Sequence, residues 1–144
     1  MDDTINLNPL VMVNDLARAA ATVGFTISSD PLTGSLLRML AASKPSGEVL
    51  ELGTGVGMGT AWLLEGIDAA AHLTTVDHHE ETTAIARRFL GSDARVTFQL
   101  MDGIAFISSC HQHRAFDLIF ADAPPGKFEA LDETLALLTH TTRT

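Results

Sequence analysis

Four short apolar runs alternate with amphipathic stretches over the last two thirds of the chain, and this alternation restricts the fold more than any other feature. The apolar runs predict strands at residues 48–52, 72–77, 95–100 and 116–122. The stretches that follow them predict helices at residues 58–67, 80–90, 104–110 and 127–138. Repeated strand–helix units are typical of a parallel sheet with helices on both faces. The sequence therefore predicts a doubly wound α/β fold with a mostly parallel sheet.

Two further helices are predicted ahead of the first strand. Apolar residues recur at helical spacing over residues 9–23, and Gly24 follows as a stop. Asp30 as an N-cap and Pro31 at the first helical position begin a second helix, which ends near Pro45. We expect one domain, in which residues 1–47 form the N-terminal helices and residues 48–144 form the α/β core.

Charge and cysteine content narrow the class of protein. The 144 residues carry 18 acidic and 9 basic side chains without a basic cluster, which argues against nucleic acid as a partner. The single cysteine, Cys110, favours a reducing compartment, with the cytoplasm as the expected location. The sequence shows no signal peptide and no apolar stretch long enough to span a bilayer, so no membrane partner is expected.

Polar stretches follow each predicted strand. They are residues 51–59, 77–79, 102–103 and 122–127. In open parallel sheets, ligands bind beyond the carboxyl ends of the strands, where the strand order reverses. Polar groups that meet at this rim of an apolar scaffold predict a single binding site.

The stretch Gly53-Thr54-Gly55-Val56-Gly57 follows the first predicted strand. Its glycines allow a sharp turn and bring backbone N–H groups and a helix N-terminus close to a carboxylate or phosphate. A tight turn without a ligand is the simpler alternative. The dinucleotide fingerprint G-x-G-x-x-G fails in every frame, because Met58, Thr60 and Trp62 stand where glycine or alanine is required. A phosphate-binding loop with Lys-Ser or Lys-Thr is also absent from the sequence.

Two aspartates end predicted strands at the same rim. Asp77 lies 24 residues after Gly53, where a carboxylate can accept hydrogen bonds from both ribose hydroxyls of an adenosine. Asp102 follows the third strand and could reach an adenine amino group. Either carboxylate could instead cap the helix that follows it.

These motifs, in this order, resemble those of class I S-adenosylmethionine-dependent methyltransferases. The resemblance is carried by Val49-Leu50-Glu51-Leu52-Gly53-Thr54-Gly55-Val56-Gly57, Thr75-Val76-Asp77, Asp102-Gly103 and Phe116-Asp117-Leu118-Ile119-Phe120-Ala121-Asp122. It covers roughly residues 30–138, and the nearest group is the small-molecule O-methyltransferases similar to catechol and caffeoyl-coenzyme A O-methyltransferases. The resemblance implies a Rossmann-like fold, S-adenosylmethionine as cofactor, and O-methylation of a small-molecule acceptor.

The resemblance also implies roles for individual residues. The implied cofactor contacts are Glu51, Gly53, Thr54, Gly55, Gly57, Asp77, His78, Asp102 and Asp122. Glu51 and the three glycines would hold the methionine portion, Asp77 the ribose, and His78 and Asp102 the surroundings of the adenine. Asp122 would lie at the methyl-transfer end as the preferred catalytic residue. Lys127 is the second catalytic candidate, and it would need a lowered pKa to act as a base at neutral pH.

The loop after the fourth strand departs from the family pattern. Metal-dependent relatives carry Asp-Ala-Asp-Lys there, whereas this chain has Asp122-Ala123-Pro124-Pro125-Gly126-Lys127. Only Asp122 matches a family metal ligand, and one carboxylate is a poor magnesium site. We therefore assign no metal ligand and expect any magnesium dependence to be weaker than in those relatives.

A second departure concerns strand number. The family has seven strands and the sequence predicts four, so we expect the C-terminal strands of the sheet to be missing. An open edge at the fourth strand predicts aggregation, a homodimer, or pairing within a longer parent chain.

Three alternatives complete the sequence-based interpretation. A zinc site at His78-His79 and His111-Gln112-His113 is disfavoured, because neither pair has helical i,i+4 spacing and the pairs follow different strands. An NAD(P)-dependent oxidoreductase would share the strand–helix units but not the glycine spacing. A truncated, non-catalytic cofactor-binding module is the third alternative.

Overall fold

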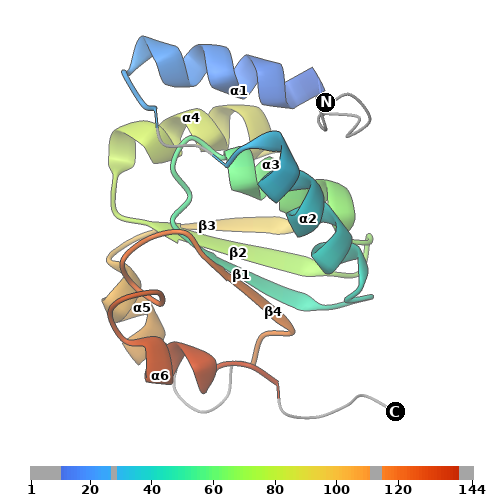
Figure 1. The fold of residues 1–144 in the computed structure, drawn as a ribbon, viewed down its shortest axis with the longest axis vertical. Helices are drawn as coiled ribbons and strands as arrows, with labels where there is room; N and C mark the ends of the chain where they lie inside the picture. Colours follow the sequence, from blue (N-terminus) through green and yellow to red (C-terminus); the bar gives the residue numbers. More distant parts are fainter. Residues whose placement is uncertain (1–10, 27–28, 111–114, 140–144) are drawn as a thin grey trace.

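A computed structural model describes residues 11–26, 29–110 and 115–139. The elements are α1 (Val11–Thr22), α2 (Pro31–Ala42), β1 (Glu48–Leu52), α3 (Met58–Gly66), β2 (His72–Asp77), α4 (Glu80–Leu90), β3 (Val96–Leu100), α5 (Gly103–Ser109), β4 (Leu118–Ala121) and α6 (Leu131–Leu135). One sheet lies between two helical layers, with α1 to α4 on one face and α5 and α6 on the other (Figure 1). Within these described ranges, no helix is long and apolar enough to cross a membrane.

The sheet has the order β3-β2-β1-β4, and all of its strand pairs are parallel. The chain moves outward from β1 to β3 and then returns to the other side of β1, so the strand order reverses between β1 and β4. This reversal confirms the predicted doubly wound α/β fold. Beside the start of β4, Phe116 forms an isolated parallel bridge with Leu138, in which the Phe116 N–H donates to the Leu137 carbonyl at 2.7 Å.

Each helical layer has its own hydrophobic core against the sheet. Val49 and Leu73 belong to the cluster under α1 to α4, which also contains the only tryptophan of the chain, Trp62. Leu50 belongs to the opposite cluster, which also contains the single cysteine, Cys110. Successive strand residues therefore alternate between two cores, which explains why the strands read as nearly continuous apolar runs.

The contact between α2 and α3 depends on a glycine. Asp30 caps α2 as predicted, since its carboxylate accepts hydrogen bonds from the N–H groups of Leu32 and Thr33 at 2.9 and 3.0 Å. One turn later, Gly34 lies against the indole of Trp62, which is fully buried. A Cβ atom at Gly34 would overlap the indole ring, so the helices approach this closely only because Gly34 has no side chain.

The predicted bounds of the helices and strands agree closely with the observed ones, except in the last predicted strand and helix. The predictions for β1, β2 and α4 match the observed bounds, and β3 begins one residue later than predicted. β4 is shorter than the predicted strand, because Phe116 makes only the bridge to Leu138.

The helix predicted at residues 127–138 is wrong in its start and length, since α6 spans only Leu131–Leu135. The Pro124 carbonyl instead accepts hydrogen bonds from the N–H groups of Lys127, Phe128 and Glu129, which form a turn. Gly126 supports this turn with a φ of +82°. The helix predicted over residues 127–138 therefore begins four residues too early.

Candidate functional site

The glycine turn joins β1 to α3 at the reversal of strand order. Gly53 has a φ of +106°, and a Cβ there would lie 3.1 Å from the backbone oxygen of Asp122, so the turn passes directly beside the loop after β4. Gly57 has a φ of +93°, and a Cβ there would lie 2.8 Å from the Cβ of Ala86 in α4. Gly53 thus permits the approach of two loops, whereas Gly57 permits the packing of the turn against a helix.

Glu51 is a buried carboxyl group at the end of β1, with 1% of its surface exposed. Its Oε2 atom accepts hydrogen bonds from the hydroxyls of Thr60 at 2.6 Å and Thr75 at 2.7 Å. Burial raises the pKa of Glu51 to about 8, against the opposing effect of the two hydroxyls and with a further rise from the charges of Asp122 and Asp77. The Glu51 carboxyl group is therefore protonated and uncharged at pH 7.

Thr54 links the glycine turn to this carboxyl group. Its hydroxyl oxygen lies 2.7 Å from that of Thr75, in a buried pair. Because the Thr75 hydroxyl hydrogen is donated to Glu51, the Thr54 hydroxyl is the donor in this pair. A continuous buried hydrogen-bond chain therefore runs from the turn to Glu51.

Asp77 ends β2 and is held in place by backbone groups. Its Oδ2 atom accepts from the Gly55 N–H at 2.9 Å, and its Oδ1 atom accepts from the His79 N–H at 3.0 Å. Burial is the largest single influence and acts to raise the pKa of Asp77, but the hydrogen bonds from His79 and Gly55 together lower it below its usual value. His79 itself occupies the N-cap position of α4, so Asp77 is not the cap of that helix.

His78 and Asp102 lie at the same rim in different environments. The His78 side chain is 62% exposed. Asp102 is the N-cap of α5, and its Oδ1 atom accepts from the Ala105 N–H at 2.8 Å. The capping alternative therefore holds for Asp102, and the adenine contact remains a prediction for both residues.

Asp122 and Lys127, the two catalytic candidates, lie in the loop after β4. Partial burial raises the pKa of Asp122, and the charge of Lys127 partly offsets this rise. The Lys127 ammonium lies 5.3 Å from the centre of the Phe128 ring. Asp122 is thus a stronger base than an ordinary aspartate, while the Lys127 ammonium lies over a neighbouring aromatic ring.

One cavity of about 620 Å³ opens where these elements meet. Eight predicted site residues line it: Glu51, Gly53, Thr54, Gly55, Asp77, His78, Asp102 and Asp122. Gly57 and Lys127 are not among the described residues that line it, so the structure does not place these two with the others. The volume of the cavity falls within the range of small-molecule sites. The predicted single site at the carboxyl rim is therefore present as one cavity.

Other lining residues escaped the sequence-based prediction. Phe25 and Ser29 come from the connection between α1 and α2, where no motif or strand end signals a site. A Cβ at Gly55 would lie 3.0 Å from the Phe25 ring, so this ring covers the glycine turn. Pro124 and Pro125 also line the cavity, and they belong to the stretch 122–127 that the sequence analysis placed at this rim.

Comparison with known families agrees with this geometry. A family model described as "Methyltransferase domain" matches residues 50–144, which include the end of β1, the glycine turn and the loop after β4. The chain belongs to this methyltransferase family. Membership confirms the resemblance that the sequence motifs indicated and gives no support to the oxidoreductase alternative.

Relatives of this methyltransferase chain are named as O-methyltransferases. The catechol O-methyltransferase of Niastella koreensis is 29% identical over 123 residues, which is 81% of this chain and 54% of that protein. A provisionally named O-methyltransferase of Mycolicibacterium vanbaalenii is 35% identical over 100 residues, which is 67% of this chain and 44% of that protein. The chain thus spans about half the length of these curated relatives.

Solved methyltransferase structures share the fold. The O-methyltransferase TomG of Streptomyces achromogenes, in complex with SAM, superposes with a TM-score of 0.84 at 20% identity and covers 94% of this chain and 64% of that one. The O-methyltransferase of Bacillus cereus, in complex with SAH, gives a TM-score of 0.82 at 20% identity, with the same coverage. The Rossmann-like methyltransferase fold is therefore shown for this chain.

Proposed function

We propose that this chain forms the S-adenosylmethionine site of an enzyme that methylates an oxygen of a small-molecule acceptor. The observation that carries the proposal is the convergence of Glu51, the glycine turn, Asp77 and Asp122 on one cavity at the reversal of strand order. Relatives named as O-methyltransferases support the reaction type, and neighbours solved with SAM or SAH support the cofactor.

The cavity residues suggest an orientation for the cofactor. Gly53 and Gly55 present backbone beside Glu51, where the methionine portion would bind. Asp77 is held by backbone groups with its carboxylate at the cavity wall, where it would accept hydrogen bonds from the ribose hydroxyls. The adenine would then lie toward His78 and Asp102.

Catalysis in such a site is mainly positioning. When bound, S-adenosylmethionine supplies a methyl group that is already activated by its positive sulfur. The protein has to hold the acceptor oxygen in line with that methyl group, exclude water and accept the acceptor's proton. Asp122 lines the cavity and its pKa is raised, which makes it a stronger base than an ordinary aspartate. We therefore propose Asp122 as the base in preference to Lys127.

Calorimetry tests the choice of cofactor. We expect S-adenosylhomocysteine to bind at least about tenfold more tightly than NAD, because the glycine spacing required by a dinucleotide is absent. Titrations of both ligands into the same preparation decide between them. NAD affinity equal to or above that of S-adenosylhomocysteine would contradict the proposed function.

Substitution of Asp77 tests the ribose contact. We expect Asp77→Ala to weaken S-adenosylhomocysteine binding roughly tenfold to a hundredfold, equivalent to roughly 1–3 kcal/mol, because the variant leaves the ribose hydroxyls without an acceptor. Asp15→Ala, which removes a carboxylate from α1 outside the cavity, is the matched control and should bind like the unaltered chain. Equal affinities in both variants would argue against the ribose assignment.

A further inference from the structure

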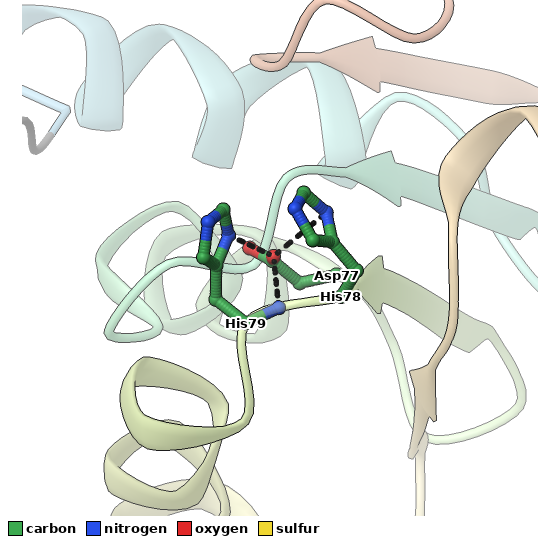
Figure 2. Close-up of side chains that lie close together, drawn as sticks. All are labelled: Asp77, His78 and His79. Carbon is green, nitrogen blue, oxygen red and sulfur yellow. Dashed lines mark hydrogen bonds and ion pairs between the residues drawn. The ribbon is translucent and has the colours of Figure 1, made fainter.

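We propose that Asp77, His78 and His79 form a binding site for a divalent transition-metal ion at the mouth of the cavity. Figure 2 shows both imidazoles directed toward the Asp77 carboxylate at the end of β2. One ligand atom from each of the three residues lies within 4.8 Å of the other two. Over the part of the chain that the structure describes, no other group of histidine, cysteine and carboxylate side chains gathers in this way.

The distances between the three groups suit a shared ion. The Asp77 Oδ1 atom lies 3.0 Å from the His79 Nδ1 atom and 4.0 Å from the His78 Nδ1 atom. Ligand atoms of a tetrahedral zinc ion lie roughly 3.4 Å apart, given bonds of roughly 2.0–2.2 Å. The two observed distances fall on either side of this value and the third separation is within 4.8 Å, so rotations of the imidazoles would bring the three ligand atoms to corners of a tetrahedron. The fourth corner is left for water.

One ligand is fixed and the other two are accessible. The Asp77 side chain is only 10% exposed and is held by the N–H groups of Gly55 and His79. The side chains of His78 and His79 are 62% and 66% exposed, so an ion can reach their ring nitrogens from solvent. A pre-positioned carboxylate with two adjustable imidazoles lowers the reorganisation that binding requires.

The ligand types select the metal. Two imidazole nitrogens and one carboxylate oxygen suit zinc, copper or nickel, whereas magnesium and calcium prefer oxygen ligands. The net charge of -9 also favours cations near the surface. The site is separate from the family magnesium ligand matched by Asp122, because it lies at the end of β2 and not after β4. The sequence alone disfavoured a zinc site at His78-His79 and assigned Asp77 to ribose or to a helix cap. The structure supplies what the sequence lacked, because it brings the Asp77 carboxylate to both imidazoles.

An ion in this site would compete with the cofactor. It would occupy the Asp77 Oδ1 atom, which is one of the acceptors offered to the ribose. This consequence rests on the proposed function, whereas metal binding itself does not.

Zinc titration tests the site directly. We expect Zn²⁺ to bind the unaltered chain in calorimetry, and we expect His78→Ala/His79→Ala to lose at least about tenfold in affinity for each imidazole removed. His72→Asn removes a histidine at the opposite end of β2 and is the matched control, which should keep the affinity. Circular dichroism confirms that each variant is folded. Zinc affinity unchanged in the double variant would overturn the proposal.

Spectroscopy and competition supply independent readouts. Co²⁺ in the site should give intense visible d–d absorption, well above that of Co²⁺ in water, which the double variant lacks. Intense absorption retained by that variant would also overturn the site. S-adenosylhomocysteine should bind less tightly with saturating Zn²⁺ than with chelator, and equal affinities would overturn the competition. Failure of S-adenosylhomocysteine to bind even with chelator would contradict the proposed function, while the zinc titration still decides the metal site.

Discussion

As the pH rises from 4.5 to 9, the free energy of unfolding should fall further for the unaltered chain than for Glu51→Gln. The difference between the two decreases should be on the order of 5 kcal/mol. In the folded chain Glu51 keeps its proton up to about pH 8, whereas the ordinary value is 4.5. Between these values the folded state binds more protons than the unfolded state, so stability decreases as the pH rises. The stabilisation is fully present below pH 4.5 and is lost through about pH 8.

Glutamine at this position cannot ionise but keeps the buried contacts. Its carbonyl can accept the hydrogen bonds from Thr60 and Thr75, and its amide group takes the place of the Oε1 atom beside Gly59. Urea denaturation at several pH values measures the difference between the two chains. Glu48→Gln, on the same strand but exposed, is the matched control and should follow the unaltered chain. Parallel pH profiles for Glu51→Gln and the unaltered chain would show that Glu51 is not a buried proton-bearing acid.

Gly34→Ala should destabilise the fold by about 3 kcal/mol, although alanine is the better helix former. The new methyl group would overlap the indole of Trp62, which is fully buried and cannot move aside. Either α2 or the indole must shift, and both are packed in the core under α1 to α4. Overpacking therefore outweighs the gain in helix propensity.

Ser35→Ala is the matched control for this prediction. It also replaces a poorer helix former by alanine, at the next position of α2, and Ser35 is not among the buried residues of that helix. We expect its free energy of unfolding to equal or exceed that of the unaltered chain in urea denaturation. A Gly34→Ala variant as stable as Ser35→Ala would contradict the close approach of α2 and α3.

The sequence predicted the regular elements well because their signals are local. The predicted bounds of β1, β2 and α4 match the observed ones, since the apolar pattern that predicts each element lies within it. The start of α6 was missed because the turn set by Pro124 and Gly126 overrides the helical spacing that follows it. Local pattern alone could not weigh these two signals against each other.

The sequence predicted the site residues that lie at strand ends. It did not predict the contacts that depend on packing between distant segments. Strand ends placed Glu51 and Asp77 at one rim, as the fold class requires. The hydrogen bonds of Thr60 and Thr75 to Glu51 join residues 9 and 24 positions away, and only the folded core brings them together. Phe25 enters the cavity from a connection between helices, which no strand-end rule covers.

The division of the interior into two cores gives each face of the sheet its own natural reporter. Trp62 lies in one core and Cys110 in the other, and the chain contains one residue of each kind. Indole fluorescence therefore follows the loosening of the layer formed by α1 to α4. The rate at which a thiol reagent modifies the buried Cys110 follows the opening of the opposite layer. A comparison of the two rates would reveal whether the layers open together or one after the other, without any added label.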